Sequence, residues 1–261
     1  MRFSISFSKS FRSVTGALIL FAMTFTFSGC FEIIEEMWLN KDGSGRYDMV
    51  FDMSGMMKSG LFDMIEQMAE SDSTGMEISS QMPEHLDSVM YFKDLPDSIM
   101  QRFTQPEVVK RTQMHIQIDK GEGLMKMTVR LDFKNMTEVN YLLNNLDKIQ
   151  GGQKLDLPMA DALGSGPLFG GKDMKLFSQS KKQIERFKIY NKEDMEDEEG
   201  LDQMKMFMSG ATYSTIYHLP GKVKKVSNKN AKIDGKTVDI TVSLLDLLTE
   251  TATSATTIRY K

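Results

Sequence analysis

Apolar and polar residues alternate with a period of two along several segments, the pattern of β-strands with one buried face. Residues 112–119 and 124–133 show it most clearly, and Gly-Glu-Gly at 121–123 separates them. Two alternating segments joined by a short glycine-containing turn predict a β-hairpin. The expected inward set of the second strand is Met125, Met127, Val129, Leu131 and Phe133.

Two further hairpins are predicted. Residues 32–40 and 46–53 flank Lys41-Asp42-Gly43-Ser44-Gly45, whose glycines permit the positive φ of a tight turn. Near the other end, residues 237–244 alternate just after the turn signal Asp234-Gly235. Other strand-like segments either complete the same sheet or form a second one; they are 184–190, 213–219, 221–233 and 256–260.

Two segments have the three- and four-residue spacing of amphipathic helices. Ser54 is expected to cap a helix whose apolar residues are Met56, Met57, Leu61, Met64, Ile65 and Met68. Asn135 and Glu138 resemble a capping box before Val139, Leu142, Leu143, Leu146 and Ile149. A helix after each of two hairpins predicts an α+β fold: an antiparallel β-sheet of hairpins with helices packed on one face, plus a C-terminal β-rich part.

Composition divides the chain into parts. Residues 30–150 form the expected N-terminal α+β part, interrupted by an insertion at 71–110 that is rich in Ser, Asp and Met and is expected to hold short helices. Residues 151–180 are rich in glycine without a sustained period, which predicts a linker or long surface loop. Residues 181–261 form the C-terminal β-rich part, in the same sheet or in a separate one.

The first 29 residues have the features of a secretory signal peptide. They carry three basic residues, no acid and an uncharged run over 14–29. That run is 16 residues long, shorter than the roughly 20 residues that a helix needs to span a bilayer. Acidic residues follow it at once, so a permanent transmembrane helix is the less favoured interpretation.

The end of this signal resembles a bacterial lipobox. Ser28-Gly29 precedes Cys30, the only cysteine of the chain, although Phe27 stands where that motif usually has Leu, Val or Ile. The resemblance implies cleavage between Gly29 and Cys30, a thioether-linked diacylglycerol on Cys30 and a fatty acid such as palmitate on the new N-terminus. The alternative is a free thiol at an ordinary secretory cleavage site.

Charge narrows the choice of partners. Cleavage would remove 29 residues and three basic side chains, and would change the 261-residue chain of formal charge −4 into a 232-residue chain of charge −7. An acidic chain is not suited to nucleic acid, and anionic lipid does not attract it, so the lipid at Cys30 is the expected membrane contact. Phe31 replaces the Asp of an inner-membrane retention signal, which favours the outer membrane.

Two motifs resemble ligand sites. Residues 166–172 have the spacing of a phosphate-binding loop, but Asp173 stands where Ser or Thr must bind magnesium, so a linker is favoured. Six of the seven residues in 193–199 are acidic, without the spacing of a calcium loop, so a solvated loop is favoured.

Methionine is unusually frequent, with 23 residues, and thioethers bind Cu(I). Copper-like spacings occur at Met204, Met206 and Met208 and at Met53, Met56 and Met57, but most other methionines lie on apolar faces, where they fill cores. The three histidines, His85, His115 and His218, are far apart and show no metal triad or catalytic dyad. We therefore predict no catalytic residue, no metal ligand and no cofactor.

Two stretches resemble bacterial lipoproteins that carry an LppM-type domain. They are Leu39-Asn40-Lys41-Asp42-Gly43-Ser44-Gly45-Arg46-Tyr47, and Tyr217-His218-Leu219-Pro220-Gly221-Lys222-Val223 with Val226-Ser227-Asn228. The resemblance implies an α+β surface or periplasmic lipoprotein, of the sort seen in Bacteroidota, with no enzymatic activity assigned to the fold.

The leading hypothesis is a non-enzymatic, lipid-anchored cell-envelope protein that binds a partner protein, glycan or lipid. We expect the insertion at 71–110 to present the contact surface. The alternatives are a periplasmic soft-metal (copper) binding protein that uses methionines, and an uncharacterised envelope hydrolase.

Overall fold

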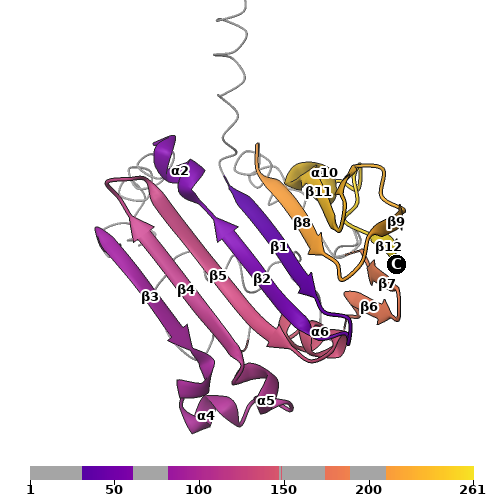
Figure 1. The fold of residues 1–261 in the computed structure, drawn as a ribbon. Coiled ribbons are helices and arrows are strands. Elements are labelled where there is room, and N and C mark those ends of the chain that lie inside the picture. Colours follow the sequence, from indigo (N-terminus) through magenta and orange to yellow (C-terminus); the bar gives the residue numbers. More distant parts are fainter. Residues whose placement is uncertain (1–30, 61–81, 147, 149–173, 189–209) are drawn as a thin grey trace, which may run out of the picture.

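The computed structural model describes residues 31–60, 82–146, 148, 174–188 and 210–261, and its main element is an eight-stranded β-sheet (Figure 1). The sheet order is β10 (Ala231–Asp234), β11 (Thr237–Ser243), β8 (Thr212–His218), β1 (Glu32–Leu39), β2 (Gly45–Asp52), β5 (Leu124–Phe133), β4 (Thr112–Asp119) and β3 (His85–Tyr91). A second, four-stranded sheet has the order β6 (Phe177–Ser180), β7 (Gln183–Arg186), β12 (Thr256–Tyr260) and β9 (Val223–Val226).

Helices are short. They are α2 (Ser54–Lys58), the 3-10 helix η1 (Phe92–Asp94), α4 (Asp97–Met100), α5 (Pro106–Val109), α6 (Met136–Leu143) and α10 (Leu244–Leu248). The fold is therefore α+β with β-structure dominant. Helix α6 packs against β5 and β6, and the wider expectation that helices cover one face stays a prediction. Within the described ranges, no helix has the length and apolarity needed to cross a bilayer.

All three predicted hairpins are confirmed. They are β1–β2, β4–β5 and β10–β11, each antiparallel. The turns contain Gly43 with φ 91°, Gly123 with φ 61° and Gly235 with φ 57°. Gly43 thus has the positive φ expected in the first turn, whereas Gly45 does not.

The C-terminal strands are divided between the two sheets: some complete the large sheet and others form the small one. Strand β8 pairs parallel with β1 and brings β11 and β10 into the large sheet. Strands β7, β12 and β9 belong to the small sheet, together with β6, which the alternation did not predict. The segment 221–233, expected as one strand, is divided between β9 and β10, which lie in different sheets.

The helix caps differ from the expectation. Ser54 does not cap α2: Met53 is the N-cap residue and makes no side-chain cap bond. The Ser54 hydroxyl instead accepts a hydrogen bond from the backbone N–H of Met125 on β5, at 3.1 Å. It thereby ties the start of α2 to the sheet. The expected continuation of this helix through residues 61–68 lies outside the described residues.

Helix α6 has half of the expected capping box. Asn135 accepts a hydrogen bond from the Thr137 N–H at 3.0 Å, which confirms it as the cap. Glu138 accepts from the Lys134 N–H at 2.7 Å, one residue before the cap. The reciprocal bond of a capping box is therefore replaced, and Glu138 also binds an arginine, as described below.

Strand β3 lies in the segment expected to be an insertion with short helices. The described part, residues 82–110, contains η1, α4 and α5, but β3 precedes them and pairs along its length with β4. Only Leu86 and Met90 are partly buried on β3, four residues apart, with Ser88 between them. This spacing resembles a helix face, so alternation did not reveal the strand.

Methionines fill much of the core, as predicted. The core lies on one face of the large sheet, where the inward side chains of β1, β2, β4 and β5 meet. Its buried methionines include Met37, Met49, Met53, Met56, Met114, Met125 and Met127. Two members of one proposed copper spacing, Met53 and Met56, are thus core residues, whereas residues 204–208 lie outside the described part of the chain.

Candidate functional site

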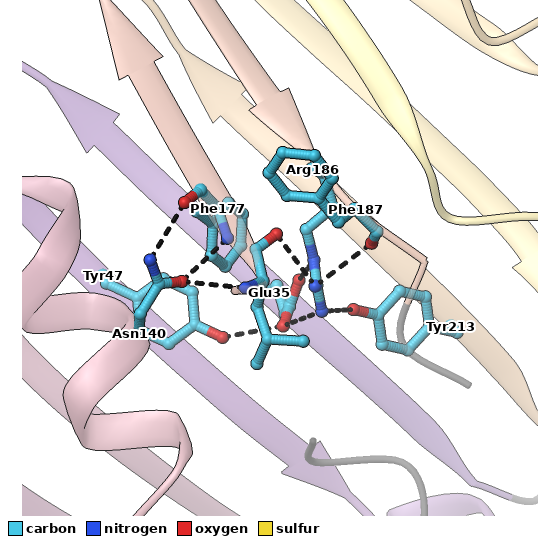
Figure 2. A network of polar contacts seen from close by, with 8 residues as sticks. Glu35, Tyr47, Asn140, Phe177, Arg186, Phe187 and Tyr213 are labelled. Carbon is cyan, nitrogen blue, oxygen red and sulfur yellow. Dashed lines mark hydrogen bonds and ion pairs between the residues drawn. The ribbon is translucent and has the colours of Figure 1, made fainter. Parts of the chain in front are cut away.

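A buried ion pair connects the two sheets (Figure 2). Glu35 on β1 and Arg186 on β7 are 3% and 2% exposed. Arg186 donates from Nε to Glu35 Oε2 and from Nη2 to Glu35 Oε1, both at 3.0 Å. Tyr47 donates its hydroxyl to Glu35 Oε1 at 2.9 Å, and Arg186 Nη2 also donates to the Tyr213 hydroxyl at 3.2 Å.

Every donor of the Arg186 guanidinium is used. Nη1 donates to the carbonyls of Leu176 and Phe187 at 3.3 and 3.4 Å, which together with the bonds above occupies all five N–H groups. The guanidinium also lies 4.5 Å from the Phe177 ring centroid. A buried charge is tolerated when it is paired and fully hydrogen-bonded. This network therefore holds the sheets together and offers no free donor to a ligand.

The residues of this network keep the protonation states that its hydrogen bonds require. Burial opposes the charge of Arg186, but the adjacent Glu35 carboxylate outweighs that effect and raises the pKa of the guanidinium. Burial, followed by the negative charge of Glu35, raises the pKa of Tyr47 well above its usual value. Burial likewise raises the pKa of Tyr213. Both tyrosines remain protonated at neutral pH.

Asn140 connects α6 to this region. Its Nδ2 donates to the Phe177 carbonyl at 2.9 Å, and its Oδ1 accepts from the N–H groups of Phe177 and Leu176 at 2.7 and 3.1 Å (Figure 2). The side-chain amide of Asn140 thus donates to and accepts from the Phe177 backbone, as the backbone of a neighbouring strand would. The Arg186 guanidinium has no free donor, so we place the candidate binding site elsewhere.

A groove of about 630 Å³ opens at the end of the large sheet, where β1 turns into β2 and β5 ends. It is lined by Trp38, Asn40, Ser44, Gly45, Arg46, Arg111, Asp132, Phe133 and Lys134. These side chains come from the first predicted hairpin, from the end of the second and from the residue before β4.

The β1–β2 turn shapes one wall of the groove. Asp42 accepts hydrogen bonds from the hydroxyl and the backbone N–H of Ser44, at 2.7 and 3.0 Å, and these bonds lower the pKa of Asp42. At Gly45 a Cβ atom would lie 2.0 Å from the Trp38 carbonyl oxygen and 2.6 Å from the Phe133 ring. Only glycine allows this close approach of backbone and ring.

Three side chains stack across neighbouring strands at the edge of the groove. Trp38 on β1 lies opposite Arg46 on β2 and His218 on β8 in the strand registers. The His218 and Trp38 rings are 5.0 Å apart and 11° from parallel, and Arg46 Cζ is 3.7 Å from the Trp38 ring centroid. Since β2 and β8 flank β1, both faces of the indole are covered and the Arg46 guanidinium is held in place.

The cations of the groove differ in how fully they are paired. Arg111 forms a bidentate ion pair with Glu138 at 2.7 and 2.9 Å. It also donates to the backbone carbonyl of Asp132 at 2.8 Å. Arg46 makes no hydrogen bond with the described residues, and its buried Nε has only an ion contact, to Asp48 Oδ1. Its contact to Asp48 is 3.6 Å long.

The remaining partners leave Arg46 available. Asp48 is already held by Arg130, whose Nε and Nη2 donate to its two oxygens at 2.7 to 3.1 Å. The Lys134 ammonium, also exposed, has neither a hydrogen bond nor an ion pair among the described residues. Arg46 and Lys134 therefore bring to one groove hydrogen-bond donors that no described residue accepts, and Asp132 lines the same groove. Neither charge is isolated, because Arg46 lies 3.6 Å from Asp48 and the Lys134 ammonium acts on the Glu138 carboxylate.

The site residues predicted from sequence are not part of this groove. Gly29 and Cys30 lie outside the described residues, as do 166–173 and 193–199. Each histidine contacts a different acid: His85 with Asp119 at 3.3 Å, His115 with Asp87 at 2.6 Å and His218 with Glu36 at 2.7 Å. No group of three or more His, Cys, Asp or Glu in the described ranges is placed to hold a metal ion.

Sequence reasoning missed Trp38, Arg46, Arg111 and Lys134 as site residues. A signal for two of them was present, because pairing the predicted strands around residues 41–45 puts Trp38 opposite Arg46. The contribution of Arg111 and Lys134 depends on how the second hairpin packs beside the first, which alternation does not specify.

Comparisons with known proteins give one distant structural match. No family model matches the chain, and no curated protein matches it. Among solved structures, the NMR structure of the folded domain of LppM from Mycobacterium tuberculosis matches with a TM-score of 0.40 and 8% identity, over 89% of this chain and 91% of that one. It is a domain of the type that the sequence resemblance named, and a TM-score below 0.5 assigns neither fold nor function.

Proposed function

We propose that this protein is a non-enzymatic, lipid-anchored protein of the cell envelope, placed at the outer membrane, that binds a partner carrying an oxyanion in the groove beside Trp38. The anchor is the lipid on Cys30, which follows the uncharged signal segment directly. The binding role rests on one observation: Arg46 and Lys134 line the groove, and neither side chain donates a hydrogen bond to a described residue.

The groove has the features of a prepared anion site. The Arg46 guanidinium is held 3.7 Å over the Trp38 ring, so little conformational freedom is lost when its N–H groups bind a carboxylate or phosphate. Cations with unused hydrogen-bond donors are notable in a chain with a formal charge of −4, because acids outnumber bases. Asp132 in the same groove disfavours a highly charged polyanion and favours a ligand with one localised anionic group.

The anchor is tested by metabolic labelling with a fatty acid. We expect label in the full-length chain and none in the Cys30→Ala variant, since only the thiol accepts the diacylglycerol. Equal labelling of both chains would refute the anchor and leave the groove hypothesis intact.

The groove is tested by isothermal titration calorimetry of the purified full chain. The probes are D-glucuronate and inorganic phosphate, with neutral D-glucose as the control. We expect saturable binding of at least one anion, no binding of glucose, and weaker binding in Lys134→Gln. Lys225→Gln removes an exposed lysine of β9 outside the groove and should leave binding unchanged. Absence of saturable binding by both anions would contradict the proposal.

The copper and hydrolase alternatives have no supporting observation among the described residues. The role expected for residues 71–110 as a contact surface stays a prediction.

A further inference from the structure

Strand β3 forms one outer edge of the large sheet (Figure 1). It pairs on one side with β4 over all seven residues. No strand of the described chain pairs with its other side. An unpaired edge of this length, without proline or lysine, is a template for another strand.

The opposite edge of the sheet is better protected. Strand β10 has only four residues and contains Lys232, and short edge strands with lysine are a common protection against pairing. Strand β10 exposes one large apolar side chain, Ile233, whereas β3 exposes two, Val89 and Tyr91, which are 41% and 47% exposed. On its other face, Leu86 and Met90 pack only partly against the core. Both faces of this edge thus leave apolar surface uncovered.

We propose that β3 pairs antiparallel with β3 of a second copy of this chain, so that two eight-stranded sheets become continuous. A two-fold axis perpendicular to the sheet relates such strands. Because the axis keeps each face on its own side, only residues of the same face can lie opposite each other. The axis must therefore pass through a residue position.

Ser88 is the position that the sequence of β3 favours. With the axis at Ser88, all seven residues pair: His85 with Tyr91, Leu86 with Met90 and Asp87 with Val89 of the other copy. No like charges meet. With the axis at Asp87, two carboxylates lie opposite each other and only five residues pair. With the axis at Val89, five residues pair.

This register also covers the exposed apolar surface on both faces of β3. Leu86 and Met90 of the two copies meet on the core side, where each is already partly buried. Val89 and Tyr91 are covered on the open side by Asp87 and His85 of the other copy. Cross-strand pairs of this kind contribute about 0.2–1 kcal/mol each, and like charges in the same position destabilise.

The test compares a negative and a positive side chain at residue 89, by sedimentation velocity of the full chain in detergent. Val89→Asp places a carboxylate opposite Asp87 of the other copy, whereas Val89→Lys places an ammonium there. We expect the unmodified chain and Val89→Lys to be dimers and Val89→Asp to be a monomer. Ile233→Asp, at the exposed Ile233 of the β10 edge, is the matched control and should remain a dimer. A monomeric unmodified chain, or the same state for both residue-89 variants, would overturn the proposal.

Cross-linking tests the register independently. Ser88→Cys lies on the axis, so a short bis-maleimide should join two copies in high yield. Lys232→Cys on β10 should give no more product than the unmodified chain, which controls for any reaction at Cys30. Equal yields for Ser88→Cys and Lys232→Cys would contradict pairing through β3. Circular dichroism of each variant shows that the sheet is retained.

Discussion

Two arginines of this protein occupy opposite kinds of environment. Arg186 is 2% exposed, lies between the sheets and uses all five of its N–H groups on a carboxylate, a tyrosine and two carbonyls. Arg46 lies 3.7 Å over the Trp38 ring at the edge of a groove and makes no hydrogen bond with the described residues. The same side chain is saturated in one place and available in the other.

The difference separates structure from function. A buried cation whose donors are all satisfied contributes to the fold only, because a ligand would have to displace bonds that already exist. A cation held in place by an aromatic ring, with free donors facing a groove, is prepared to bind an anion at little further cost. Substitutions should therefore affect stability at Arg186 and ligand binding at Arg46.

The largest effect is expected at Arg186. Arg186→Met leaves the Glu35 carboxylate buried without its partner, which typically costs about 3–5 kcal/mol of unfolding free energy. Arg46→Met removes a surface cation whose ion contact contributes about 0–1 kcal/mol. Urea unfolding of both variants measures the contrast, and equal losses would show that the two environments do not differ as described.

The turn that positions Arg46 gives the next largest effect. Gly45→Val places side-chain atoms where the Trp38 carbonyl and the Phe133 ring already lie, so β2 must shift. Such overpacking costs about 1–3 kcal/mol. Gly43→Ala, at φ 91°, introduces backbone strain of about 1–2 kcal/mol but meets only the flexible Gln179 side chain. The Tm of Gly45→Val should be lower than that of Gly43→Ala, and the reverse order would refute the close-approach argument.

Arg111 is intermediate between the two arginines, and its partner makes stability depend on pH. Burial raises the pKa of Glu138, but the hydrogen bonds from Arg111 and the Lys134 N–H outweigh it and lower the pKa below its ordinary 4.5. A lowered pKa stabilises the fold above the unfolded value and loses that contribution as pH falls toward the folded value. Glu138→Gln should therefore lose less stability than the unmodified chain between pH 6 and 3, measured by urea unfolding. If the unfolding free energy of both chains fell equally with pH, the Arg111–Glu138 ion pair would be contradicted.

Local pattern predicted the hairpins but not their connections. Alternation and turn glycines located β1–β2, β4–β5 and β10–β11, because these features depend on neighbouring residues. The Glu35–Arg186 pair joins residues 151 apart, and no local period indicates it. Ser54 was misassigned as a cap because its hydroxyl binds Met125, 71 residues away.

The candidate site follows the same division. The register of one hairpin is enough to place Trp38 opposite Arg46, so that half was within reach of the sequence. Which cations stay free depends on competition: Asp48 is held by Arg130 and Glu138 by Arg111. Only the arrangement of strands decides those pairings.

The most direct test uses the fluorescence of Trp38, the only tryptophan of the chain. Emission is recorded while D-glucuronate or inorganic phosphate is added to the unmodified chain, Arg46→Gln and Lys225→Gln. We predict a saturable change in the unmodified chain and in Lys225→Gln. In Arg46→Gln, loss of a charged hydrogen bond worth about 1.5–3 kcal/mol should weaken binding roughly tenfold or more. Unchanged affinity in Arg46→Gln, or no response in any chain, would contradict the groove as the binding site.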